Sequence, residues 1–233
     1  MVLVCSDPPF VYLKTHKTAS TSVEMALQRA LEDDPAAEIT ERTPARLTAR
    51  GVIGSRLYRR RLDYLTNYRV QKWRPHVAAD RVRAWIGEAD WARSAKIAMI
   101  RNPFDRLVSY FHFKARYRRL AHDWDAQRAA FQDFAASNKW RDDREIVFSR
   151  GEFCITHPIL FERLREDLAR VANSLSIAPL GDLPHTKPRS APRRDTADYF
   201  DPPAIEIVRR RMAWVFEHFD YPERPGAAQL ETA

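Results

Sequence analysis

The chain has 233 residues, of which 45% are hydrophobic, and its formal net charge of +8 comes from 39 Lys and Arg against 31 Asp and Glu. This hydrophobic content excludes a wholly disordered chain, and the charge favours anionic partners: a nucleotide, a sulfated or acidic sugar, nucleic acid or a membrane surface. The alternative for the charge is an arginine-rich surface that is merely solvated. Two cysteines without metal-ligand spacing do not indicate a disulfide framework and fit a reducing compartment.

The segment Phe10–Leu27 predicts a strand, a polar loop and a helix. Phe10–Leu13 is an aromatic and β-branched run typical of a buried strand, and apolar residues at helical spacing predict a helix from about Thr21 to Leu31. The loop between them holds two lysines and several hydroxyls. A helix N-terminus with such side chains can bind a phosphate, although ordinary N-caps and a solvated lysine give the same pattern. The glycines of a Walker A loop are absent, which disfavours an ordinary ATPase or GTPase.

Residues 36–75 give little pattern apart from the basic cluster Tyr58–Leu62. This cluster fits the solvated face of a helix, with contact to an anionic acceptor or nucleic acid as the alternative. His76 follows Pro75 at the start of a helix predicted over 79–86, a kind of junction where catalytic side chains are often displayed. A lone histidine is more often structural, so the position alone does not assign a role.

A second apolar run, Ala95–Ile100, predicts a buried strand of a parallel sheet, and Pro103 suits the first turn of the helix that follows. Arg101 then lies at the carboxyl end of this strand, the edge at which open α/β sheets bind ligands. Its guanidinium can fork onto a phosphate, with Ser109 about two turns along the helix. A structural salt bridge is the alternative for Arg101.

The later elements follow from periodicity and composition. Residues 112–150 are expected to be helical, with large aromatic residues that pack in the core rather than stack on bases: Trp124, Phe131, Phe134 and Trp140. We expect a short strand over Phe153–Thr156, an amphipathic helix over Phe161–Leu175 and a last helix over about Pro203–Phe216. A basic, proline-rich loop covers 178–203, and residues 222–233 form a frayed tail.

With both anion loops in view, the chain resembles the sulfotransferases that use 3′-phosphoadenosine-5′-phosphosulfate (PAPS), specifically the carbohydrate branch related to the heparan-sulfate 2-O and HNK-type enzymes. Lys17–Ser22 is similar to the loop that binds the 5′-phosphosulfate, with Ala19 where many members carry glycine. Arg101–Tyr110 is similar to the 3′-phosphate motif. Two weaker similarities complete a resemblance over about residues 10–221: Phe161-Glu162 with Asp167, and Thr186-Lys187 before Tyr199–Asp201.

The resemblance implies a P-loop-like, three-layer α/β fold with a central, mainly parallel sheet flanked by helices. It implies one domain over 1–233, with 36–75 and 112–150 as acceptor-side insertions. PAPS is the expected donor and PAP the product, and no metal is expected because lysine and arginine supply the positive charge. Lys17 would stabilise the leaving phosphate oxygen. The residues implied in donor binding are Lys17, Thr18, Ala19, Ser20, Thr21, Ser22, Arg101, Ser109, Lys187 and Arg193.

The acceptor hydroxyl also needs a general base, and a histidine is suited to that role at neutral pH. The resemblance implies His76, which lies between the two nucleotide motifs as the base histidine does in the 2-O branch. His16, beside Lys17, could simply orient the loop. Glu24 is less suited because it falls inside the first helix.

The expected acceptor is a carbohydrate or glycolipid hydroxyl, with a small metabolite or a peptide tyrosine left open. No apolar run approaches the roughly 20 residues of a membrane span, Met1–Cys5 is too short for a secretory signal, and the Golgi anchor of animal members is missing. We therefore expect a bacterial-type cytoplasmic enzyme, with peripheral membrane association as an option. One alternative is a nucleotide or sugar kinase, but the Walker-type loop that it would need is not evident in this sequence. The other is a basic nucleic-acid-binding protein, but the sequence contains no recognition motif for nucleic acid. We expect no nucleic-acid partner.

Overall fold

The computed structural model describes residues 2–32, 34, 36–40, 43, 46–53, 75–115, 123–180, 183 and 194–226. Contacts divide the chain into two compact units, one of Met1–Ile100 with Asp143–Pro188 and one of Arg101–Asp142 with Arg189–Ala233. Within the described part, none of the helices combines the length and the apolar character that crossing a bilayer requires. The basic cluster Tyr58–Leu62 and two predicted donor-binding residues, Lys187 and Arg193, lie outside the described residues.

The first unit is built on a six-stranded sheet with the strand order β3-β4-β1-β2-β5-β8. Its strands are β1 (Leu3–Ser6), β2 (Pro9–Leu13), β3 (Arg46–Thr48), β4 (Gly51–Ile53), β5 (Ala95–Ile100) and β8 (His157–Leu160). β2, β5 and β8 run parallel, whereas β1 pairs antiparallel with β2 and β4, and β3 with β4. The α/β fold with a central sheet is thus confirmed. Its β2–β5–β8 part is parallel as predicted, and β1, β3 and β4 add antiparallel pairs that the prediction did not include.

The parallel strands end at one edge of the sheet. Leu13, the last residue of β2, pairs with Ala98, and Ile100, the last residue of β5, pairs with Leu160 at the end of β8. The two predicted anion motifs begin directly after β2 and β5. Such sheets bind their ligands at the carboxyl edge. The ends of β2 and β5 lie at this edge, as the prediction of two anion motifs after these strands requires.

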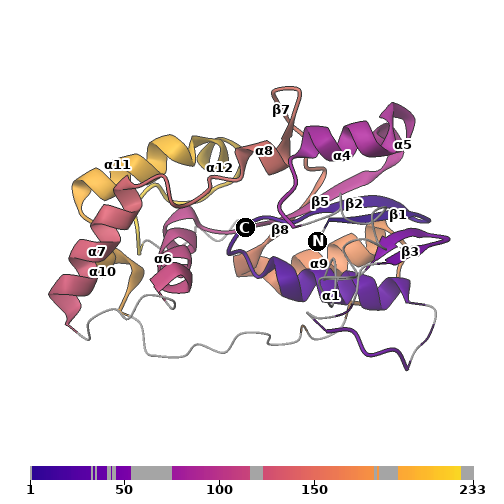
Figure 1. Ribbon diagram of the computed structural model, residues 1–233, viewed down its shortest axis with the longest axis horizontal. Helices are drawn as coiled ribbons and strands as arrows, with labels where there is room; N and C mark the ends of the chain where they lie inside the picture. Colours follow the sequence, from indigo (N-terminus) through magenta and orange to yellow (C-terminus); the bar gives the residue numbers. More distant parts are fainter. Residues whose placement is uncertain are drawn as a thin grey trace, which may run out of the picture. The chain divides into compact units, whose positions relative to one another are not determined.

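Helices cover both faces of this sheet. α1 (Ser20–Leu31) and α9 (Leu164–Ser174) lie on one face, and α4 (Ala79–Ile86) and α5 (Glu88–Arg93) lie on the other (Figure 1). Alternate strand residues point to the same face, and those facing α1 and α9 form a continuous apolar core. Its buried members are Leu3, Cys5, Phe10, Tyr12, Val23, Leu27, Leu31, Ile97, Met99, Ile159, Leu168, Val171 and Leu175.

Short elements complete the first unit. α8 (Arg144–Val147) leads into a hairpin of β6 (Phe148–Ser149) and β7 (Glu152–Phe153), and the 3₁₀ turn η1 (Phe161–Arg163) leads into α9. The strand predicted over Phe153–Thr156 is wrong in extent, because β7 ends at Phe153 and β8 begins only at His157. At the hairpin of β3 and β4, a Cβ on Gly51 would lie 1.9 Å from the carbonyl oxygen of Val4, and φ there is +134°. Only glycine allows this close approach.

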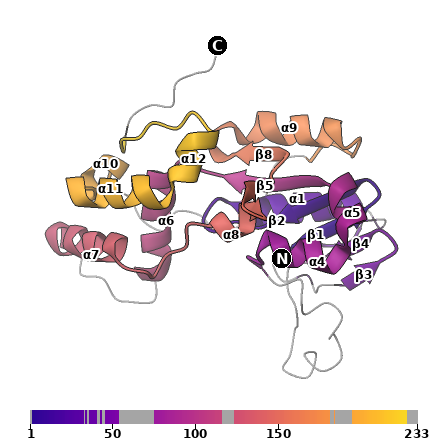
Figure 2. The same cartoon turned by 90° about the horizontal axis from the view of Figure 1, so that it is seen from above.

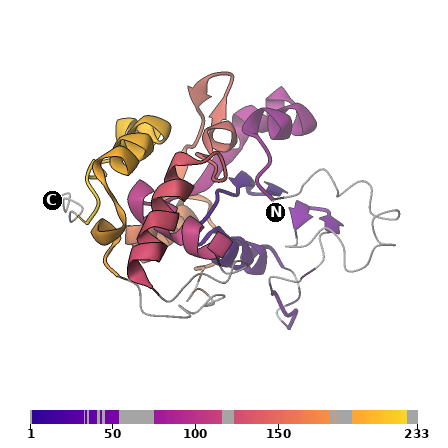
Figure 3. The same ribbon diagram turned by 60° about the vertical axis from the view of Figure 1, so that its left-hand side comes forward.

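The second unit is helical in its described residues. It contains α6 (Pro103–Ala115), α7 (Trp124–Ala136), α10 (Thr196–Tyr199), α11 (Pro202–Arg211) and α12 (Ala213–His218), and α11 packs against α6, α7 and α12 (Figures 2 and 3). The ring of Phe131 meets those of Tyr199 and Phe200 edge-on, at centroid distances of 5.3 and 4.8 Å. Phe131, Phe134 and Trp140 are buried, which confirms that these aromatic residues belong to the core. The predicted last helix is two helices, divided at Met212.

Candidate active site

The loop between β2 and α1 has the backbone of an anion site. α1 begins at Ser20, and Lys17 and Ala19 before it adopt φ angles of 62° and 61°. Thr18 between them is not among the residues with positive φ. A left-handed residue directly before a helical one, as at Ala19 and Ser20, turns successive backbone N–H groups toward one concave side, a geometry that favours anions. The positive end of the α1 dipole adds to the same effect.

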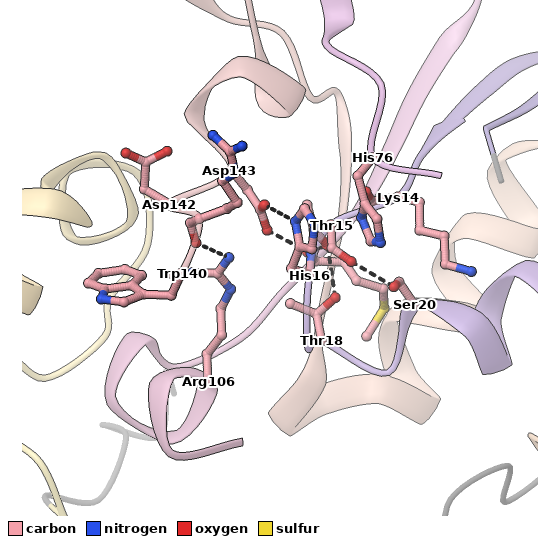
Figure 4. A network of polar contacts seen from close by, with 12 residues as sticks. Lys14, Thr15, His16, Thr18, Ser20, His76, Arg106, Trp140, Asp142 and Asp143 are labelled. Atoms are coloured by element: carbon pink, nitrogen blue, oxygen red, sulfur yellow. Dashed lines mark hydrogen bonds and ion pairs between the residues drawn. The ribbon is translucent and has the colours of Figure 1, made fainter. Parts of the chain in front are cut away.

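Buried hydroxyl groups hold this loop in place. The Thr15 hydroxyl donates to the carbonyl oxygen of Met99 in β5, 2.6 Å away, and so accepts from the Thr18 hydroxyl at 2.8 Å. The Ser20 hydroxyl donates to the Thr15 carbonyl at 2.7 Å (Figure 4). Since each hydroxyl has a single proton, the donors of Thr18 and Ser20 that can face an anion are their backbone N–H groups. Thr21 is half-buried and Ser22 is buried.

Two further contacts attach α1 to β2. The Tyr12 hydroxyl donates to the Ser20 carbonyl at 2.8 Å, and burial, aided by the charge of Glu24, raises the pKa of Tyr12 well above its usual value. Lys14 forms a buried ion pair with Glu24. Of the two loop lysines, Lys14 therefore serves the scaffold. Lys17 is half-buried at the turn itself and is the lysine suited to an anionic ligand.

A buried carboxylate and two histidines lie beside the loop (Figure 4). Asp143, only 2% exposed, accepts the backbone N–H of His16 at 2.7 Å and its Nδ1–H at 2.5 Å. The His16 ring stacks on that of His76, with centroids 3.5 Å apart. His76 donates Nδ1–H to the Lys14 carbonyl at 2.8 Å, since that oxygen can only accept. Burial, reinforced by His16, lowers the pKa of His76 to about 3.

The structure thus brings the predicted His76 next to the Lys17 loop, together with a residue that the sequence interpretation missed. Asp143 lies 127 positions from His16 and precedes the four-residue helix α8, with φ at 65°. Its only sequence signal is the Asp-Asp pair at 142–143 before that helix. An acidic pair before a helix is also an ordinary capping pattern, so the contact could not have been inferred.

The second predicted motif begins the second unit. Arg101 is half-buried and directly follows β5. The Asn102 side chain caps α6 by accepting the N–H groups of Phe104 at 2.9 Å and Asp105 at 3.3 Å, and Pro103 occupies the first helical position as predicted. Ser109 is half-buried within α6. The strand and the helix that the sequence predicted are therefore present, and the Asn102 cap is an addition that the sequence analysis did not include.

Helix N-termini that follow the carboxyl ends of neighbouring parallel strands are typical of the class of α/β proteins that bind phosphate-bearing ligands. Within that class, the chain belongs to the Sulfotransferase family, whose sequence model matches residues 1–222. The match runs through both compact units and supports sulfuryl transfer over the kinase and nucleic-acid-binding alternatives. Searches of curated proteins and of solved structures gave no match.

Proposed function

We propose that this sulfotransferase moves the sulfuryl group of PAPS to a hydroxyl group of a carbohydrate or glycolipid, and that residues 1–233 serve this one activity. The observation that carries the proposal is the loop with left-handed residues at Lys17 and Ala19, before α1, in a chain of the Sulfotransferase family. PAPS is the donor that the resemblance of this loop and of Arg101–Tyr110 implies.

The hydrogen-bond donors and cationic side chains of the two motifs suit a phosphosulfate. Backbone N–H groups of Thr18, Ala19 and Ser20, with the N-terminus of α1 including Thr21 and Ser22, would hold the 5′-phosphate. Arg101 and Ser109 would hold the 3′-phosphate, with Lys187 and Arg193 as further candidates. Lys17 would neutralise the charge that develops on the leaving phosphate oxygen, and we expect no metal requirement. One of the two histidines beside the loop would act as the general base for the acceptor hydroxyl, and the resemblance implies His76.

The acceptor is proposed from the resemblance to the carbohydrate branch, with 36–75 and 112–150 as the segments that select it. Two free thiols, Cys5 and Cys154, support a reducing, cytoplasmic location. The positive net charge of +8 suits an acceptor on an anionic glycolipid surface. Mass spectrometry of products formed from PAPS and a panel of sugars, glycolipids, small metabolites and tyrosine peptides identifies the acceptor.

A thermal shift experiment tests the donor. PAP at about 100 times its dissociation constant should stabilise the fold by about 2.7 kcal/mol, and each kcal/mol raises the melting temperature of a chain of this size by about 2–4 °C. We expect this shift with PAP in the presence of EDTA and a smaller one with AMP. A shift with ATP and Mg²⁺ but none with PAP would overturn the proposed function.

A further inference from the structure

The two stacked histidines differ in what surrounds them. The carboxylate of Asp143 can only accept, so the Nδ1 atom of His16 carries a proton and the neutral ring has its lone pair on Nε2. The second carboxylate oxygen holds the backbone N–H of the same residue. One buried carboxylate therefore fixes both the position of His16 and the tautomer of its ring.

His76 has a carbonyl oxygen where His16 has a carboxylate. The Lys14 carbonyl fixes the Nδ1–H tautomer of His76 but does not balance a positive charge as a carboxylate does. Burial and the neighbouring His16 hold the pKa of His76 at about 3. Two parallel rings 3.5 Å apart disfavour a charge on both. Two further charged groups act on His76: Asp143, which favours a cation, and Lys14, which opposes one.

We propose that His16 is the group that takes the proton from the acceptor hydroxyl, with Asp143 as its positioning residue and His76 as a neutral ring stacked against it. This inference rests on the proposed function. The hydroxyl oxygen forms a bond to sulfur while the bond between sulfur and the 5′-phosphate oxygen breaks, and that electron pair stays on the phosphate oxygen. The hydroxyl proton moves to Nε2 of His16, and the carboxylate of Asp143 stabilises the resulting imidazolium.

The first test uses the wild-type protein without ligand. Nitrogen-15 NMR of the ring nitrogens distinguishes the two neutral tautomers of a histidine. We expect His16 to carry its proton on Nδ1. A proton on Nε2 in the neutral wild-type ring would overturn the proposal, because that nitrogen could not accept another.

The second test uses two variants that keep the geometry. In His16→Asn the amide nitrogen replaces Nδ1 as the donor to Asp143, and Nε2 is lost. In Asp143→Asn the amide oxygen accepts the backbone N–H while the amide nitrogen donates to His16 Nδ1, which moves the ring proton to Nε2. Asn also tolerates the left-handed backbone at 143. We expect kcat to fall at least about 100-fold in both variants, with the dissociation constant for PAP unchanged.

The matched control is Asp80→Asn, because Asp80 also accepts one side-chain donor and one distant backbone N–H, from Ser149 at 2.7 Å and Arg150 at 3.0 Å. Its kcat should stay at the wild-type value, and the His16 tautomer should change only in Asp143→Asn. Wild-type turnover in His16→Asn, with turnover lost in His76→Asn, would overturn the inference and leave the proposed function standing. A wild-type protein that neither binds PAP nor forms a sulfated product would overturn both.

Discussion

The ring of His16 lies parallel to that of His76, with centroids 3.5 Å apart and planes inclined by 14°. The two residues are 60 positions apart and reach each other from the loop after β2 and the turn before α4. The stack depends on protonation, since two imidazolium rings at this distance would repel each other. Its stability should therefore change with pH.

The variant His76→Asn tests this dependence. The folded-state pKa of about 3 lies below the ordinary value of 6.5, so between these values the unfolded chain binds a proton at residue 76 that the folded chain does not. The contribution of neutral His76 to the unfolding free energy is complete above pH 6.5 and is lost as the pH falls toward 3. Between pH 6.5 and 4.5 the wild type should lose about 2–3 kcal/mol more unfolding free energy than His76→Asn, measured by urea denaturation.

Asn is the informative replacement because it keeps the donor to the Lys14 carbonyl and tolerates the φ of 58° at residue 76. The control is His218→Asn, which removes an exposed histidine that also donates Nδ1–H to a carbonyl, that of Trp214 at 2.8 Å. Parallel pH profiles for the wild type and His76→Asn would contradict the prediction.

Lys17→Ala should lower turnover far more than donor affinity. A cation beside the leaving phosphate oxygen acts mainly where charge develops during transfer, and removal of one such group typically costs about 100–1000-fold in kcat. Steady-state kinetics with PAPS, together with calorimetric titration of PAP, separate the two effects. Arg93→Ala, which removes an exposed cation of α5, serves as the control. Undiminished turnover in Lys17→Ala would remove this residue from the mechanism.

Arg101→Gln should weaken PAP binding without affecting AMP binding, because only PAP carries the 3′-phosphate. A lost charge-assisted hydrogen bond of about 1.5–3 kcal/mol corresponds to about a 10–100-fold weaker affinity. Ser109→Ala should show the same selectivity with a smaller effect. Arg106→Gln is the control, because the buried Arg106 donates to the Arg141 carbonyl within the second unit. Equal losses for PAP and AMP would assign Arg101 to the scaffold.

The elements that the sequence predicted well are those with a strong local pattern. β5 over Ala95–Ile100 and α4 over Ala79–Ile86 have the predicted bounds, since a buried strand and an amphipathic helix show in their own residues. β1 and β8 were missed because each is only four residues long, too short for a periodic pattern of its own. In addition, β8 is defined by its pairing with β5, in which Ile97 and His157 are 60 positions apart. The break at Met212 lies inside an apolar pattern that continues from α11 into α12.

In the candidate site, too, the features with a local sequence pattern were predicted and those that depend on packing between elements were not. The lysine loop and the arginine turn are contiguous segments, so residue types and order were sufficient to predict both. The ion pair of Lys14 with Glu24 depends on how α1 packs against β2, and the contact of His16 with Asp143 joins residues 127 positions apart. Such contacts depend on how the elements pack, which residue types and order do not encode. They are the basis on which Lys17 and His16, rather than Lys14 and His76, are proposed to act in the reaction.

The left-handed backbone at Ala19, with φ of 61°, predicts which substitutions the loop accepts. Glycine relieves a strain of roughly 1–2 kcal/mol but costs roughly 0.5–1 kcal/mol in chain entropy, so Ala19→Gly should change the unfolding free energy little. Ala19→Val should destabilise the protein by about 1–3 kcal/mol and weaken PAP binding, because a β-branched residue resists this conformation. Ala126→Val, at an exposed position of α7, is the control. Equal effects of the two valine substitutions would contradict a strained loop.

The buried pair of Lys14 and Glu24 predicts a non-additive double-mutant cycle. Removing one partner leaves a buried charge unbalanced, so Lys14→Met and Glu24→Leu should each cost about 3–5 kcal/mol of unfolding free energy. The double variant should lose far less than the sum, because an apolar pair of similar volume fills the space.

The same double variant separates the scaffold from the chemistry. His76 is held by the carbonyl of Lys14 and not by its side chain, and the contacts of His16 with Asp143 do not involve the pair. Once the fold is restored, turnover with PAPS should return with it, as measured at a temperature where the double variant is fully folded. A double variant that is as stable as the wild type but inactive would place the Lys14 ammonium group in the reaction rather than in the scaffold.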